Sequence, residues 1–329
     1  MDEIIKNVAE LPYNWEKLNN KTLLISGGTG FIGSFICDVI RYRNNHYGCN
    51  TKIISLSRTG GIDDATVSHI KSDVANKISL DSHFDYVLHL ASHTHPKQYA
   101  ENPIGTIITN IYGCNNLLEL AKEHNARFLF TSSVEIYGEC TNRPIAEEYS
   151  GYINCNNARS GYNEAKRVCE SLIQSYRNQY DLDAVIVRLS RVFGPDKKND
   201  TKAIAQFMHN AVTKKDIVLK SSGMQRFSYC YIADAVSGIF KILFDGINGE
   251  AYNLSDDDEG LTLGEYANYI ASFSNKQVIF QIEYNDSVSK STYALLNCDK
   301  LKKLGWKPIY SVSDGLKDTY KILTNRHIH

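Results

Sequence analysis

The sequence lacks a long apolar run, a strong net charge and any internal repeat. No stretch approaches the roughly 20 apolar residues that cross a bilayer, and residues 1–20 are acidic and mixed, unlike a secretory signal. The 36 Lys and Arg residues almost balance the 37 Asp and Glu residues and are spread along the chain. We therefore expect no basic surface for nucleic acid or an anionic membrane, and we predict neither as a partner.

Paired cysteines are missing as well. The eight cysteines form no Cys-x-x-Cys pair and no tight group with histidine, which are the patterns of redox and zinc sites. We interpret them as free thiols in a reducing compartment, so we expect a cytoplasmic protein. His93 and His95 have no third ligand nearby in the sequence, and we predict that the chain binds no metal.

Short β-branched runs alternate with helical patterns from Lys21 onward, at a hydrophobic content of 43% that is ordinary for a globular protein. The nearly continuous hydrophobicity of these runs is typical of parallel strands that are covered on both faces. The runs cover residues 22–26, 52–57, 85–91, 127–132 and 183–190, and the helical patterns between them cover 31–42, 103–124 and 159–179. This alternation predicts an α/β fold with a Rossmann-type, doubly wound parallel sheet.

The regular alternation of strands and helices ends after Gly194-Pro195, where charged loops separate shorter elements. We expect helices near 201–214, 232–245 and 263–273, and strands near 217–220 and 251–254. The predicted parts are an N-terminal extension (1–20) that packs onto the body, a dinucleotide-binding Rossmann domain (21–195) and a smaller mixed α/β substrate-binding region (196–329). We expect some elements of the last part to return to the first domain.

A glycine-rich turn, SGGTGFIG from Ser26 to Gly33, follows the first predicted strand and opens the first predicted helix. Its glycines at 27, 28, 30 and 33 remove the Cβ atoms that would keep a pyrophosphate away from the backbone. The N-terminus of the helix attracts negative charge. Such a turn alone is weak evidence, but at the first strand–helix junction of an α/β pattern it predicts dinucleotide binding.

Tyr162 and Lys166, in the segment YNEAK, are four residues apart and so share one face of the predicted helix 159–179. A nearby ammonium favours the phenolate form of tyrosine, which makes Tyr162 a candidate base for a sugar hydroxyl. The segment YNWEK (13–17) fits the same template, but it precedes the glycine turn, and we interpret it as chance. The pair at 162 and 166 instead follows Ser133 at the carboxyl end of a predicted strand, where doubly wound sheets bind ligands.

These motifs, in their order and spacing, resemble the extended short-chain dehydrogenase/reductase family, in the epimerase/dehydratase branch that acts on nucleotide sugars. The resemblance covers roughly residues 21–320 and is carried by GGTGFIG, HLAS (89–92), FTSSVEIYG (130–138), YNEAK, RLSRVFGP (188–195) and MQRFSYCYIADAV (224–236). It implies that Ser133 hydrogen-bonds the reacting hydroxyl, that Tyr162 is the acid/base, and that Lys166 holds the cofactor ribose and lowers the tyrosine pKa. It also implies a homodimer formed through helices of the first domain.

The predicted site combines residues from these motifs. The cofactor-binding residues are Gly27, Gly30, Phe31, Ile32, Gly33, Ser57, Arg58, Asp73, Val74, Leu90, Ala91, Ser92, Tyr162 and Lys166. The substrate-binding residues are His93, Ser133, Arg191 and Arg226, and the catalytic residues are Ser133, Glu135, Tyr162 and Lys166. Asp73 resembles the adenine contact of the family, and Arg226 resembles the arginine that meets the diphosphate of the nucleotide sugar.

Between residues 85 and 170 the chain looks most like UDP-glucuronate decarboxylases. These enzymes and several dehydratases place Ser or Asp, then Glu, after the residue that matches Ser133, whereas this chain has Val134 and then Glu135. Glu135 stays a candidate second base, but Val134 cannot give the proton that a 4,6-dehydratase needs to expel a hydroxyl. Because side chains alternate along a strand, we expect Glu135 to face the same cleft as Ser133 as long as the strand geometry persists, with Val134 turned away or lining a wall. Arg191 stands where the decarboxylases usually carry Asn, which indicates altered substrate contacts.

We therefore expect an enzyme that oxidises C4 of a nucleotide sugar with NAD(P) and then decarboxylates or epimerises the sugar. The alternatives are a 4,6-dehydratase, a net NADPH-dependent reductase of a keto-sugar and, outside catalysis, a dinucleotide-sensing protein. The presence of Ser133, Tyr162 and Lys166 together argues against the sensor. The second predicted strand ends in Ser57-Arg58 without the Asp or Glu that binds the ribose of NAD, which favours NADP.

Overall fold

The protein is built on a seven-stranded sheet in which every pairing is parallel. The computed structural model describes residues 1–92, 101–139, 143–157, 160–196, 202–256, 260–282 and 293–328. The strands of the sheet are β1 (Thr22–Ser26), β2 (Lys52–Ser57), β3 (Val67–Lys71), β4 (Tyr86–His89), β5 (Arg127–Ser133), β6 (Ala184–Leu189) and β11 (Ala251–Leu254). Their order is β11-β6-β5-β4-β1-β2-β3, so the direction of winding reverses between β1 and β4. The predicted doubly wound sheet is confirmed.

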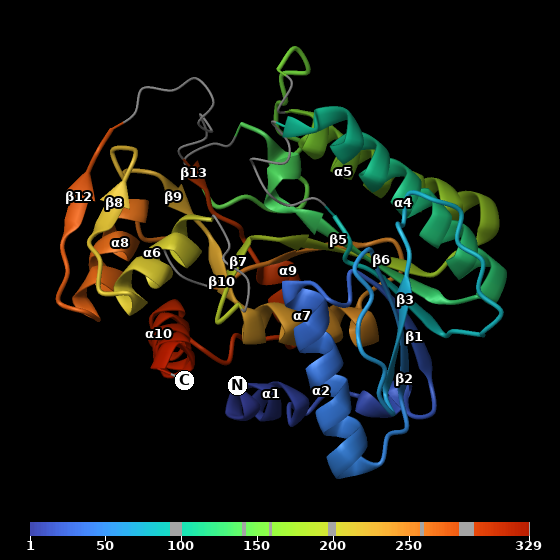
Figure 1. Cartoon of the computed structure of the whole chain (residues 1–329). Helices are drawn as coiled ribbons and strands as arrows, with labels where there is room; N and C mark the ends of the chain where they lie inside the picture. The colour runs from blue at the N-terminus through green and yellow to red at the C-terminus, as the bar shows by residue number, and fades with distance from the viewer. Residues whose placement is uncertain are drawn as a thin grey trace.

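Helices cover both faces of this sheet (Figure 1). One face carries α2 (Phe31–Tyr47) and α7 (Ile232–Asp245), and the other carries α4 (Pro103–His124) and α5 (Ser160–Tyr180). The alternation of side chains along β1 separates the two cores, because Leu23 is buried with Ile36 of α2 whereas Leu24 is buried with Leu117 of α4. Burial on both faces explains why these strands read as nearly continuous hydrophobic runs.

The chain beyond Pro195 contributes to two places. It builds a smaller lobe, at the left of Figure 1, and it returns to the central sheet with α7 and with β11, which pairs with β6. The remaining elements of this part are α6 (Ala203–Val212), β8 (Ile217–Leu219), β9 (Arg226–Phe227), β10 (Tyr229–Tyr231), α8 (Leu263–Ser272), β12 (Val278–Phe280), β13 (Tyr293–Ala294), α9 (Asp299–Lys303) and α10 (Val312–Ile328). β10 pairs with β7 (Arg191–Phe193), which directly follows β6 and so joins the lobe to the sheet.

The N-terminal residues pack against the body of the protein. α1 (Asp2–Ala9) lies against α2 and α7 and buries Ile4 and Val8. The single turn η1 (Trp15–Leu18) buries Trp15, whose ring lies 4.9 Å from that of Phe240 in α7. The apolar side of this segment therefore becomes part of the core under the sheet.

β3 is the strand of the central sheet that the hydrophobic pattern does not predict. It lies at the edge, and among its residues only Val67 is buried, so the segment carries too few apolar residues to read as a buried strand. In the parts of the chain that the structure describes, no helix combines the length and the apolar character needed to cross a membrane.

Candidate active site

The glycine turn connects β1 to α2 and leaves the start of the helix open. Gly27 has a φ of +78°, which only glycine adopts readily, and a Cβ at Gly33 would lie 2.3 Å from the carbonyl oxygen of Gly27. α2 begins at Phe31, and its N-cap residue Gly30 has no side chain to cover the first backbone N–H groups. Phe31 and Ile32 are partly buried at the start of the helix. The turn therefore fits a dinucleotide pyrophosphate, which needs close backbone approach and a positive helix end.

The carboxyl ends of β1 and β4 lie side by side at the point where the winding reverses. The backbone N–H groups of Leu90 and Ala91 both donate to the Ser26 hydroxyl at 3.2 Å, and Ser92 donates to Asn110 at 2.9 Å. Burial lowers the pKa of His89 to about 3, so this ring is neutral where it contacts the Ser26 hydroxyl at 2.8 Å. Doubly wound sheets bind ligands at this kind of reversal.

The end of β2 presents a cation rather than an anion. Arg58 is exposed, and the buried Ser57 hydroxyl donates to the carbonyl of Gly60 at 3.3 Å. The two acids of the following loop are engaged by backbone groups: Asp63 accepts from His69 N at 2.7 Å, and Asp64 accepts from Val67 N at 2.8 Å. β2 itself ends at Ser57 and leads into Arg58, without the Asp or Glu that binds the ribose of NAD.

The segment after β3 lies next to the same edge of the sheet. The Asp73 carboxylate accepts from Ala75 N at 3.0 Å, and Val74 is buried. Asn116 of α4 donates its amide to the carbonyl oxygen of Val74 at 2.8 Å. The proposed adenine contact thus sits on a loop that α4 holds in place.

Tyr162 and Lys166 lie on the first turns of α5, and both are almost fully buried. The Lys166 ammonium lies 5.9 Å from the centre of the Tyr162 ring and donates to the carbonyl of Thr131 at 2.9 Å. It also lies 4.5 Å over the ring of Phe130. Burial lowers the pKa of Lys166. A positive charge this close to the phenol favours the phenolate, which is the form that accepts a proton.

The chain departs from the sequence-based expectation directly after Ser133. β5 ends there, and the Ser133 hydroxyl accepts from Glu135 N at 3.2 Å as the cap of the 3₁₀ turn η2 (Val134–Tyr137). Strand alternation therefore does not place Glu135, and that part of the prediction is wrong, because a serine cap ends the strand two residues earlier. The helical turn still buries Val134, in a small cluster with Ile136, and leaves Glu135 partly exposed.

Glu135 meets a partner from a distant part of the chain. Its carboxylate lies 3.1 Å from the guanidinium of Arg191, which packs 3.8 Å over the ring of Phe227. The neighbouring Arg226 is exposed and donates to the carbonyl of Gly260 at 2.6 Å. The structure thus brings Ser133, Glu135 and Arg191 together, whereas His93 and His95 lie outside the described residues.

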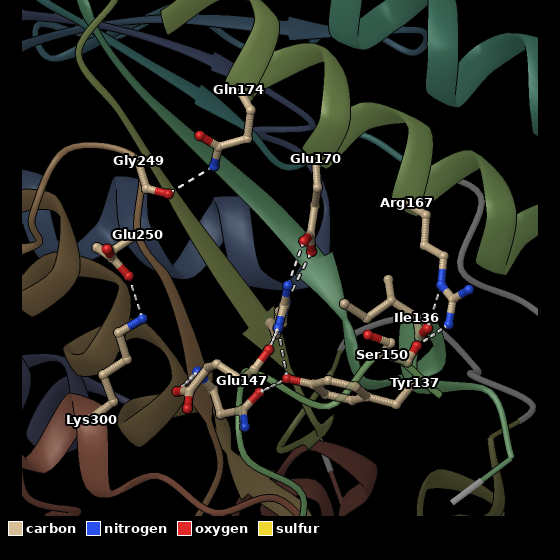
Figure 2. Close-up of polar contacts among 12 residues, drawn as sticks. Ile136, Tyr137, Glu147, Ser150, Arg167, Glu170, Gln174, Gly249, Glu250 and Lys300 are labelled. Atoms are coloured by element: carbon tan, nitrogen blue, oxygen red, sulfur yellow. Dashed lines mark hydrogen bonds and ion pairs between the residues drawn. The ribbon is translucent and has the colours of Figure 1, made fainter. Parts of the chain in front are cut away.

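Two further features were not predicted from the sequence. Asn163 donates its amide to the carbonyl oxygen of Glu135 at 2.7 Å. Arg188 of β6 forms a buried, two-pronged ion pair with Glu170 of α5, at 3.1 and 2.7 Å, and also donates to the Tyr137 hydroxyl at 3.0 Å. In Figure 2 the hydrogen bonds of Arg188 run to the labelled residues Glu170, Tyr137 and Glu147. The sequence does contain a signal for the ion pair, because Arg188 is the one charged residue within the apolar run of β6, and such a group requires a partner.

The second YxxxK segment lies at the other end of the sheet. Tyr86, the first residue of β4, donates its hydroxyl to the carbonyl of Lys17 at 2.9 Å. Burial raises the pKa of Tyr13 to about 12, so this phenol stays protonated. Tyr13 and Lys17 are therefore remote from the carboxyl ends of the strands, where the glycine turn and Tyr162 lie.

Comparison with known proteins agrees with this arrangement. The sequence model of the NAD dependent epimerase/dehydratase family matches residues 23–255. UDP-glucuronic acid decarboxylase 5 of Arabidopsis thaliana is 30% identical over 308 residues, which cover 91% of this chain and 88% of that protein. UDP-glucuronic acid decarboxylase 1 of Xenopus tropicalis is 29% identical over 311 residues, which cover 92% and 72%.

Solved structures share the fold at lower identity. The UDP-glucose 4-epimerase of Thermotoga maritima, solved with UDP-glucose, superposes with a TM-score of 0.80 at 22% identity and covers 94% of this chain and 100% of that one. The dTDP-glucose 4,6-dehydratase of Bacillus anthracis, solved with NAD, gives a TM-score of 0.76 at 22% identity, with 93% and 97% covered. From the match of the family model and the identity to its curated relatives, this chain belongs to the NAD dependent epimerase/dehydratase family.

Proposed function

We propose that the protein oxidises the C4 hydroxyl of a nucleotide-activated sugar with NAD(P) and then decarboxylates or epimerises that sugar, with UDP-glucuronate as the leading substrate. One observation carries the proposal: Tyr162 and Lys166 lie together on α5, and Lys166 donates to the carbonyl of Thr131, two residues before Ser133 at the carboxyl end of a central strand. The relatives named UDP-glucuronic acid decarboxylase support the choice of substrate.

The first step removes two hydrogens from the sugar. Ser133 hydrogen-bonds the C4 hydroxyl, and Tyr162, as phenolate, takes the proton of that hydroxyl while the C4 hydrogen leaves with its electron pair. The Lys166 ammonium, 5.9 Å from the centre of the Tyr162 ring, favours the ionised form of the phenol. The nicotinamide, when bound, takes up this hydride and later returns it. The sugar is left with a ketone at C4.

The second step uses that ketone. In a uronate the carboxylate at C6 is then β to a carbonyl, so the C5–C6 bond breaks, carbon dioxide leaves, and the electron pair passes to the C4 oxygen. As the ketone re-forms, C5 takes up a proton from solvent, and the Glu135 carboxylate directs the water that delivers it. Because Val134 next to Glu135 has no proton to give, expulsion of a hydroxyl as water lacks an acid, and the chain favours decarboxylation or epimerisation over dehydration.

The product formed from a panel of nucleotide sugars tests this function. We expect UDP-glucuronate to lose carbon dioxide when incubated with the protein and NAD(P), as read by mass spectrometry of the sugar nucleotide. UDP-glucose, GDP-mannose and dTDP-glucose serve as neutral-sugar comparisons. Loss of water from any of these hexoses would mean dehydration and would overturn the proposal.

We propose further that NADP is preferred to NAD. The support is the exposed Arg58 at the end of β2, where no Asp or Glu directly follows the strand. A 2′-phosphate would pair with this guanidinium. We expect Arg58→Ala to weaken NADP binding by about 1.5–3 kcal/mol, the usual value of a hydrogen bond to a charged group, and to leave NAD binding nearly unchanged. Equal losses for both, or tighter NAD binding by the native protein, would contradict the preference.

We propose that two copies of the chain associate through α4 and α5. Ile104, Ile108 and Tyr112 recur every four residues on α4 and are all exposed, as is Val168 on α5. Residues at this spacing share one helix face, and a contiguous exposed apolar face marks an interaction site. We expect light scattering to give the mass of a dimer, and Ile108→Asp to give a monomer. A monomeric native protein would disprove this assembly.

A further inference from the structure

Glu135 is held at each of its three polar groups by a different element. Its backbone N–H donates to the Ser133 hydroxyl at 3.2 Å, its carbonyl oxygen accepts from the Asn163 amide at 2.7 Å, and its carboxylate pairs with Arg191 at 3.1 Å. The side chain nevertheless remains 41% exposed, so the carboxylate stays accessible while the backbone is fixed.

The turn that carries Glu135 cannot hold this geometry by itself. η2 is a 3₁₀ turn of four residues that ends at Gly138, with a φ of +60°. Such short turns have poor internal hydrogen bonds and depend on contacts from outside. Those contacts come from α5, because Asn163 donates to the carbonyl of Glu135 and Arg167 donates to that of Ile136 at 2.8 Å.

The donors on α5 are the direct neighbours of the residues that act on C4. Asn163 follows Tyr162, and Arg167 follows Lys166. One rigid helix therefore sets both the position of the first base and the position of the backbone that carries Glu135. The distance between Tyr162 and the backbone of Glu135 is therefore set by α5 and not by the surrounding loops.

Arg191 fixes the other end of the same residue. Its guanidinium carbon lies 3.8 Å from the centre of the Phe227 ring, and its backbone N–H donates to the carbonyl of Ser228 at 3.3 Å. A guanidinium packed this closely on a ring is restricted in its movement, so its paired nitrogen holds the Glu135 carboxylate in one direction.

We propose that Asn163 and Arg191 are positioning residues for the second chemical step, acting through Glu135. The inference rests on the proposed role of Glu135 at C5. Loss of either contact would let the Glu135 carboxylate shift its position. A displacement of about 1 Å in an active site can lower the rate by about 10²-fold. Oxidation at C4 depends on Tyr162, Lys166 and Ser133 and would proceed unchanged when the Asn163 contact alone is lost.

Asn163→Ala separates the two steps experimentally. With UDP-glucuronate as substrate, we expect reduced-cofactor absorbance to rise at the native rate, while the decarboxylated product forms about 10- to 100-fold more slowly and the keto-sugar is released. Gln174→Ala is the matched control, because Gln174 also lies on α5 and donates its amide to a backbone carbonyl, that of Gly249 at 2.8 Å (Figure 2). This control should change neither step. The native rate of the first step shows that the variant is folded.

A double variant shows whether Asn163 acts through the carboxylate. Glu135→Gln alone should slow the second step, and adding Asn163→Ala to it should cause little further loss, because both changes disable one group. Arg191→Met should slow the second step as Asn163→Ala does, and Arg191→Lys, which keeps the charge, should restore part of that rate. Only Asn163→Ala is expected to leave the first step unchanged, because Arg191 is also expected to contact the substrate. Equal slowing of both steps in Asn163→Ala, no slowing at all, or a full additional loss in the double variant would overturn the inference alone. Normal product formation by Glu135→Gln would overturn the proposed role of Glu135 as well.

Discussion

Replacing Tyr162 by Phe should reduce turnover by about 10²–10⁴-fold, the usual contribution of a general acid–base group. The change removes only the phenolic oxygen and keeps the ring that packs at the start of α5, where the side chain is 5% exposed. Lys166 keeps its hydrogen bond to Thr131, which does not involve the phenol. We therefore expect the variant to fold and still to bind NAD(P).

Steady-state turnover and a cofactor titration on the same preparation check this result. Tyr13→Phe is the matched control, since Tyr13 and Lys17 have the same spacing but lie at the opposite end of the sheet. That variant should keep native turnover. A Tyr162→Phe protein that still worked at the native rate would show that another group accepts the proton.

Replacing Arg188 by Met should lower the free energy of unfolding by about 3–5 kcal/mol, because it leaves a buried carboxylate without its partner. The side chains of Arg188 and Glu170 are each only 13% exposed, and the guanidinium also bonds the Tyr137 hydroxyl and the carbonyl of Glu147. All of these acceptors would lose their donor at once.

Urea unfolding measures this loss, and two comparisons assign its cause. Arg188→Met combined with Glu170→Leu should recover much of the stability, because no unpaired charge then remains inside. Lys317→Met breaks an exposed ion pair with Asp314 and should change little. If Arg188→Met proved no more destabilising than Lys317→Met, the buried pair would not stabilise the fold.

The central fold follows from local sequence patterns. Strands that are covered on both faces read as hydrophobic runs, and α4 begins at Pro103 and ends at His124 as its pattern predicts. β3 cannot be predicted from such a pattern, because its pairing with β2, rather than its own composition, makes it a strand. An edge strand with one buried residue has no distinctive pattern.

The candidate site was predictable only where its residues are neighbours in sequence. Tyr162 and Lys166 share a helix face by spacing alone, and the glycine turn joins consecutive elements. Glu135 and Arg191 are 56 positions apart in the sequence. Their pairing depends on the path that the chain takes from β6 into β7, and no local pattern encodes that path. Strand alternation misplaces Glu135 because the Ser133 side chain caps the turn that follows and so ends the strand. The sequence alone does not show whether a serine caps a turn or contacts a substrate.

The return of β11 and α7 to the central sheet has a consequence for how the chain folds. β6 is bordered by β5 on one side and by β11 on the other, so a chain ending near residue 195 would leave β6 as a bare edge. It would also uncover the apolar face that Ile239 of α7 covers. Unpaired edges and uncovered faces promote aggregation. During synthesis the nascent chain must therefore pass residue 254 before β6 is paired on both sides, which makes the protein one folding unit whose β11 edge is the last part of the sheet to be completed.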